Sequence, residues 1–177
     1  MKWKLATCAA ILLTGAALTQ EQVRERVTPE SAQEMLSPAL AAFIAQSRDA
    51  AIARGVRSVA PDVREAFAGF VSEEVLERVR WRVDGDVGLL GRALFQPGAV
   101  RAVTLDNVIV FANAEEAANV KLWAHELFHV IQYEQWGIEG FAERFVADHR
   151  AIEHEAREFR WAFMRATGRV PEVPDTR

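Results

Sequence analysis

The chain has 177 residues, of which 50% are hydrophobic and 26% are charged, and its formal net charge is −4 at pH 7. This length is enough for one globular domain with its own core, and the absence of a basic excess argues against a nucleic-acid-binding protein.

Residues 1–19 are predicted to be a signal peptide. Lys2 and Lys4 precede an apolar run from Cys8 to Leu18, and Gly15-Ala16-Ala17 offers a cleavage site. The run is shorter than the roughly 20 apolar residues of a membrane-spanning helix, so we expect a periplasmic or secreted protein, with an uncleaved membrane anchor as the alternative. Cleavage would remove Cys8, the single cysteine, and would exclude disulfides and thiol catalysis.

The first half of the chain is predicted to be helical. Thr28-Pro29 and Ser37-Pro38 each combine an N-cap residue with proline at the first helical position. The first pair predicts a short helix and the second a helix over residues 38–54, which Gly55 ends.

Two further helix starts lead into a segment with a different pattern. Pro61 and Ser72 each open a helix, whereas residues 102–111 alternate and are rich in β-branched side chains. That segment predicts one or two strands. Asp106-Asn107 interrupts the alternation and predicts a turn or an exposed edge, which could bind an extended peptide by strand addition.

Two long helices are predicted for the last third of the chain. Asn113 and Glu116 form a capping pair before a helix over about 114–136, which Gly137 ends. A last helix is expected over about 141–167.

The sequence His125-Glu126-Leu127-Phe128-His129 falls on the first of these helices. Two histidines four residues apart project from one helix face, so both imidazoles can bind one zinc ion. Glu126 can reach a water at the open metal position and act as general base. This H-E-x-x-H arrangement is typical of zincins, in which the preceding strand lies beside the bound peptide. The alternative is an ordinary helix with two structural histidines.

The third zinc ligand must come from farther along the chain. A catalytic zinc normally has three protein ligands, but Gln132 and Gln135 occupy the positions where an extended H-E-x-x-H motif would continue. Glu153 lies at the edge of the apolar stripe of the last helix, where it can lean toward a partner helix. It is our first choice, and the alternatives, in order, are His149, Glu155 and Asp148.

Several other polar residues have candidate roles near the motif. Gln132 lies one turn beyond His129 and could hydrogen-bond a ligand or the substrate. A Tyr or His often stabilises the developing oxyanion in zincins, and the candidates here are Tyr133, His149 and His154.

Residues from about Ser58 to Arg160 resemble a bacterial family of zinc metallopeptidases that includes the metallopeptidase-like domains associated with contractile injection systems. The family is defined by an H-E-L-x-H-V-x-Q helix and a later helix ending in E-x-E-A. The matching residues here are 125–133, HELFHVIQY, and 153–156, EHEA. The resemblance implies zinc at His125 and His129, Glu126 as base and Glu153 as a gluzincin-like third ligand. It implies no particular substrate.

The predicted architecture is α+β, a mainly helical zincin-like domain with a small sheet beside the active-site helix. We expect a signal peptide, an N-terminal helical segment over residues 20–57, the zincin-like domain over 58–168 and a flexible tail over 169–177. The predicted function is an exported zinc-dependent metallopeptidase that hydrolyses peptides or proteins, touching the membrane only if the signal is uncleaved. The alternatives are a catalytically weak metal-binding or scaffolding domain of the same fold and a zinc-free helical interaction protein.

Overall fold

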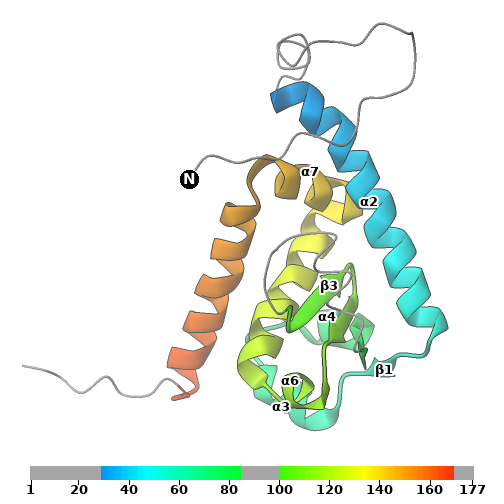
Figure 1. Cartoon of the computed structure of the whole chain (residues 1–177). Coiled ribbons are helices and arrows are strands. Elements are labelled where there is room, and N and C mark those ends of the chain that lie inside the picture. Colours follow the sequence, from blue (N-terminus) through cyan, green and yellow to red (C-terminus); the bar gives the residue numbers. More distant parts are fainter. Residues whose placement is uncertain (1–28, 85–99, 170–177) are drawn as a thin grey trace, which may run out of the picture. The chain divides into compact units, whose positions relative to one another are not determined.

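The computed structural model describes residues 29–84 and 100–169, with side chains from residue 33 onward (Figure 1). The chain divides into two compact units, residues 1–32 and 33–177, and all described elements belong to the second unit except the first four residues of helix α2. The predicted signal peptide and nearly all of the predicted tail lie outside the described residues, so both stay predictions.

The N-terminal helical segment is one helix, α2, over Pro29–Ala53. The prediction of two helices separated at Ser37-Pro38 is wrong, because the helix continues through Pro38. A proline inside a helix removes one backbone hydrogen bond, but the helix continues past it, with Ala41 buried one turn later. The predicted end of the helix is confirmed, since Gly55 has a φ of 92°.

The two short helices that follow begin where the sequence predicts. Helix α3, over Pro61–Phe67, has proline in its first turn. Helix α4, over Glu73–Arg78, has Ser72 as its N-cap, whose hydroxyl accepts a hydrogen bond from the Val75 amide.

A four-stranded mixed sheet adjoins these helices. Its strands are β1 (Arg57–Ser58), β2 (Arg80–Val83), β3 (Ala102–Leu105) and β4 (Val108–Phe111), in the order β1-β2-β4-β3. The predicted strand segment is an antiparallel hairpin, β3 and β4, with its turn at Asp106 and Asn107. Strands β1 and β2 are not predicted, and β2 pairs with β4 in parallel. Among the described strands β3 therefore forms one edge of the sheet.

The predicted cap at Asn113 is confirmed, but it opens a shorter helix than expected. Its side chain accepts a hydrogen bond from the Glu116 amide and starts α6, over Ala114–Ala117. The long helix α7, over Val120–Ala166, begins at a second cap, where the Asn119 side chain accepts from the amides of Lys121 and Leu122.

Helix α7 contains two breaks, at Gly137 (φ 69°, ψ 176°) and at Asp148 (φ −155°, ψ 81°). They divide it into a first segment (120–136), a middle segment (138–147) and a third segment (149–166). The break at Gly137 is predicted, whereas the break at Asp148 interrupts what we expected to be one helix. The third segment runs back beside the first (Figure 1), and the rings of Phe128 and Phe159 lie 5.1 Å apart.

Two hydrophobic clusters cover the two faces of the sheet. Strand β4 is buried throughout, and its side chains alternate between the clusters, as successive residues of a strand must. Ile109 and Phe111 join a cluster built with α3, α4 and the first and third segments of α7. Val108 and Val110 join a cluster built with α2 and with residues from all three segments of α7. The predicted α+β architecture, mainly helical with a small sheet, is confirmed.

In the described part of the chain, no helix is both long enough and apolar enough to cross a membrane.

Candidate metal centre

His125, His129 and Glu153 meet between the first and third segments of α7. The two Nε2 atoms lie 3.2 Å apart. The Glu153 carboxylate reaches both rings, with one oxygen 3.3 Å from Nε2 of His125 and the other 3.5 Å from Nε2 of His129. All three candidate ligand atoms lie within 4.8 Å of one another. The structure thus brings together a possible metal-binding triad, in which Glu153 lies 24 positions beyond the nearer histidine in the chain.

Local packing orients the motif toward the third segment. The first segment buries Trp123, Leu127 and Val130 in the cluster beside α3 and α4. That leaves the face with His125 and His129 opposite the helix that carries Glu153. The His129 side chain is 8% exposed, that of His125 14% and that of Glu153 33%. The triad is therefore largely shielded from solvent but still accessible at Glu153.

The electrostatics of the triad favour an ionised Glu153 beside a protonated His129. Burial raises the pKa of Glu153, but hydrogen bonds from His125 and His129 outweigh it and hold that pKa well below its usual range. Burial lowers the pKa of His129, but Glu153 and the charge of Glu126 outweigh it, so the net shift is upward.

The three donor groups fit a zinc ion. Two imidazole nitrogens that face each other at 3.2 Å require a proton or a cation between them. Two neutral imidazoles and one carboxylate are a ligand set of catalytic zinc sites, with a fourth position left open. Whether zinc binds here stays a prediction.

The two histidines differ in how their second ring nitrogens are held. Nδ1 of His129 lies 2.8 Å from Oε1 of Gln132, whose amide nitrogen donates to Glu155. Nδ1 of His125 is buried and has no hydrogen-bond partner among the described residues. A ligating histidine usually donates its other N–H to a partner, and only His129 has one in this part of the chain.

Glu126 lies on the sheet side of the first segment. Its side chain is almost fully buried and accepts a 2.7 Å hydrogen bond from the hydroxyl of Thr104 on β3. Sequence reasoning missed Thr104. The available signal was a lone hydroxyl within an otherwise apolar strand of the hairpin that precedes α6 and the motif helix.

The other candidates for the third ligand lie outside the triad. Asp148 caps the third segment by accepting from the amides of Arg150 and Ala151. Glu155 accepts from Gln132, and His149 lies 5.8 Å from the ring of Phe145. The geometry therefore favours the first choice, Glu153.

The candidates for oxyanion stabilisation are spread over different environments. Tyr133 is buried, stacks on Phe141 at 3.9 Å and donates to the Thr104 carbonyl at 3.4 Å. His149 is half-buried and His154 is exposed. No geometry among these residues singles out one of them, and the role stays a prediction.

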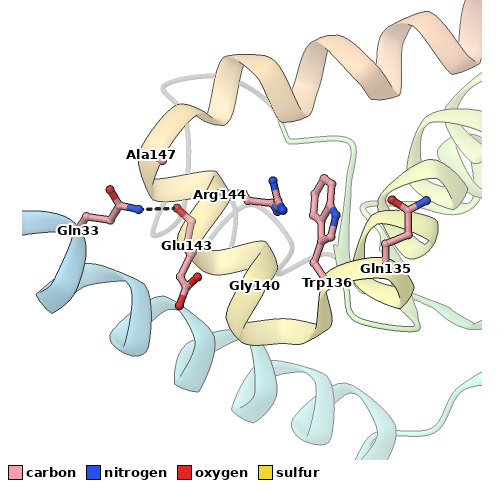
Figure 2. A pocket seen from close by; sticks show the side chains of 7 residues that line it. All are labelled: Gln33, Gln135, Trp136, Gly140, Glu143, Arg144 and Ala147. Carbon is pink, nitrogen blue, oxygen red and sulfur yellow. Dashed lines mark hydrogen bonds between the residues drawn. The ribbon is translucent and has the colours of Figure 1, made fainter. Parts of the chain in front are cut away.

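A hollow of about 380 Å³ lies elsewhere, between α2 and the middle part of α7 (Figure 2). Figure 2 shows Arg144 beside Trp136, with the guanidinium 4.6 Å from the ring centroid, and Gln33 donating to the Glu143 carbonyl. Its lining residues are Gln33, Gln135, Trp136, Gly140, Glu143, Arg144 and Ala147. None of them is a predicted site residue, so we assign this hollow no part in the metal centre.

Residues 58–137 match the family model of the eCIS core domain, where eCIS denotes extracellular contractile injection system. The match covers β1 to the first segment of α7, including His125, Glu126 and His129, and ends before Glu153. No curated protein and no solved structure matches the chain. The predicted association with injection systems is thus supported, whereas the metallopeptidase part of the resemblance has no support from these comparisons.

Proposed function

We propose that this chain is a zinc-binding domain of a protein that works with an extracellular contractile injection system. One observation carries the proposal, namely that two imidazole nitrogens and one carboxylate converge from two helical segments. The match to the eCIS core domain supplies the context. Imidazole ligands favour zinc over calcium or magnesium, which prefer oxygen.

Zinc bound here would act as a scaffold, because it would link the first segment of α7 to the third. Binding to the folded state alone stabilises a protein by about 2.7 kcal/mol at a ligand concentration of 100 times Kd. We expect partner proteins of the injection system, and we propose that the chain is exported to meet them.

The test is the metal content of the purified chain, measured by mass spectrometry beside two variants. We expect about one zinc per chain from three convergent ligands, retained in His149→Ala and lost in Glu153→Ala. Both substitutions lie on the third segment and truncate a polar side chain to alanine, so they are matched in kind. A wild-type chain that takes up no zinc, even when zinc is added back, would refute the proposal.

Peptide hydrolysis is a second candidate function, and the position of Glu126 favours it. A bound zinc ion would polarise a peptide carbonyl and lower the pKa of a water molecule. Glu126 follows the ligand His125 directly, and Thr104 holds its carboxylate in one orientation. In this role Glu126 would accept a proton from the attacking water and pass it to the leaving amine. Strand β3, which supplies Thr104, is an edge strand among the described strands, and an extended peptide could pair with it.

Glu126→Gln separates the two functions. The amide keeps the shape of the side chain but cannot accept a proton as a base, so we expect zinc to stay bound and any hydrolysis of a peptide library to stop. Hydrolysis that survives in Glu126→Gln would exclude this mechanism. A wild-type protein that binds zinc but cleaves no peptide would exclude hydrolysis and leave scaffolding as the one remaining function of the two.

A further inference from the structure

We propose that Gln132 is a positioning residue, which fixes the tautomer of His129 and ties that ring to the helical segment carrying Glu153. The inference rests on the proposed zinc site and adds to it the reason why His129 presents Nε2, and not Nδ1, to the metal. It also assigns Glu155 a role as the anchor of Gln132.

The orientation of the Gln132 amide follows from its neighbours. The side chain is 1% exposed, and its nitrogen lies 2.8 Å from Oε2 of Glu155 and 3.4 Å from the carbonyl oxygen of Ile152. A carboxylate and a carbonyl only accept hydrogen bonds, so the NH₂ group must face them. The reversed amide would place an oxygen against two oxygens and would lose both hydrogen bonds, of which the one to Ile152 is buried.

This orientation determines which nitrogen of His129 carries the proton. With the NH₂ group turned toward the third segment, Oε1 of Gln132 faces Nδ1 of His129 at 2.8 Å. Because an amide oxygen only accepts, Nδ1 must be the donor. The neutral ring then has its lone pair on Nε2, the atom that faces His125 and Glu153.

The same contacts link two ligands of the proposed site. Gln132 belongs to the first segment, whereas both of its acceptors, Ile152 and Glu155, belong to the third. Glu153 lies between those two acceptors in the chain. A shift of the third segment would therefore break the hydrogen bonds that keep Gln132 beside His129. The same shift would move Glu153 away from the two histidines. His125, whose Nδ1 has no such partner among the described residues, gains nothing from this chain of hydrogen bonds.

The first experiment compares zinc affinity, by competition with a chelator, in Gln132→Leu and Gln135→Leu. Both variants make the same substitution on the first segment, but Gln135 is exposed and three residues away from the network. Loss of a partner behind a ligating histidine typically weakens metal binding by about 10–100-fold, and we expect this for Gln132→Leu alone. Wild-type affinity in Gln132→Leu would overturn the inference.

A reciprocal exchange tests the hydrogen-bond directions without relying on loss of function. In the double variant Gln132→Glu with Glu155→Gln, the new amide can donate to the new carboxylate, which still accepts from Nδ1 of His129. We expect the double variant to recover most of the affinity that Gln132→Leu loses. Gln132→Glu alone places two carboxylates in contact and should bind zinc more weakly than the double variant. Equal affinity in the single and double variants would contradict the proposed role of Glu155.

A third measurement needs no metal and separates failure of this inference from failure of the proposed function. ¹⁵N NMR of the histidine side chains, in zinc-free protein at a pH where the rings are neutral, reports the tautomer directly. We expect His129 to be protonated at Nδ1 in the wild type and in Gln135→Leu, and to lose that preference in Gln132→Leu. A wild-type His129 protonated at Nε2 would refute the inference whether or not zinc binds. A wild type that has the expected tautomer but binds no zinc would refute only the zinc site.

Discussion

The two sides of the first segment of α7 are held by different parts of the molecule. On the sheet side, Glu126 accepts a hydrogen bond from Thr104 of β3. On the side of the third segment, His129 contacts Gln132, which donates to Glu155. The first segment thus carries Glu126, whose carboxylate is held by β3, and His129, whose ring is held through Gln132 by the third segment.

Under the proposed functions, the difference predicts that proton transfer and metal binding can be altered separately in this site. The sheet side holds the residue that would move a proton, whereas the third-segment side holds the residues that would bind zinc. The two sides also touch through Ile152 of the third segment, which packs in one cluster with Val103 and Leu105 of β3. The hydrogen bonds on each side are nevertheless separate, so we expect a change confined to one of them to affect mainly its own side.

The largest effect is expected from Phe163→Ala, which weakens the third-segment side. Phe163 is fully buried and stacks on Phe67, with ring centroids 4.4 Å apart. Truncating a buried Phe to Ala typically costs about 3–5 kcal/mol of folding stability. Because this packing holds the third segment, which carries Glu153, we also expect weaker zinc binding. Urea unfolding and chelator competition measure the two effects.

The control for Phe163→Ala is Trp161→Ala, which truncates an aromatic side chain on the same segment. Trp161 is 44% exposed, and exposed positions usually change stability by less than about 0.5 kcal/mol. Equal losses in the two variants would mean that the cluster does not anchor this segment.

Thr104→Val tests the sheet side at nearly constant volume. The substitution removes the hydroxyl that donates to Glu126 at 2.7 Å, and a hydrogen bond to a charged group contributes about 1.5–3 kcal/mol. We expect a loss of that size in urea unfolding and an unchanged zinc affinity. Thr104→Ser keeps the hydroxyl and should retain most of the stability. Zinc binding that weakens in Thr104→Val would show that the two sides are coupled.

Gly137→Ala tests the break that lets α7 turn back. Gly137 has φ 69° and ψ 176°, a region that is essentially restricted to glycine and costs other residues about 1–3 kcal/mol. An added Cβ would meet its nearest neighbour, a Glu139 oxygen, only at 3.8 Å, so the penalty would come from the backbone alone. We expect lower stability and weaker zinc binding. Gly168→Ala, also at positive φ but beyond the last helix, should lower stability and leave zinc binding unchanged.

The sequence predicts the parts of the site that depend on local pattern. His125 and His129 are recognisable because four residues on a helix bring two side chains onto one face. Ser72 and Asn113 are recognisable as caps because their side chains bond amides three residues away. Glu153 follows from its place at the edge of an apolar stripe, with a family resemblance in support.

The parts that depend on tertiary contacts were not predicted. Strand β2 pairs with β4 about 28 positions away, and nothing in its own four residues marks that pairing. Thr104 gains its role only because β3 is placed beside the motif helix. The break at Asp148 is visible as an Asp followed by a helical pattern, but an Asp on a helix surface gives the same local signal. In each case the decisive partner is far away in the chain.

The smallest effect concerns Tyr133, whose hydroxyl donates to the Thr104 carbonyl at 3.4 Å. Burial, and then the charges of Asp106 and Glu126, raise its pKa well above the ordinary value. A folded-state pKa above the unfolded value means that the contribution of Tyr133 to stability is complete below about pH 10 and is lost as the pH rises further. Because Tyr133 is the single tyrosine, absorbance at 295 nm follows it alone, and we expect no tyrosinate step near pH 10 in the native protein. Tyr133→Phe should cost less than about 1 kcal/mol at neutral pH and should flatten the alkaline decline in the free energy of unfolding. A tyrosinate step near pH 10, with the near-UV circular dichroism still native, would mean that water reaches this ring and that the sheet side of the motif helix is open.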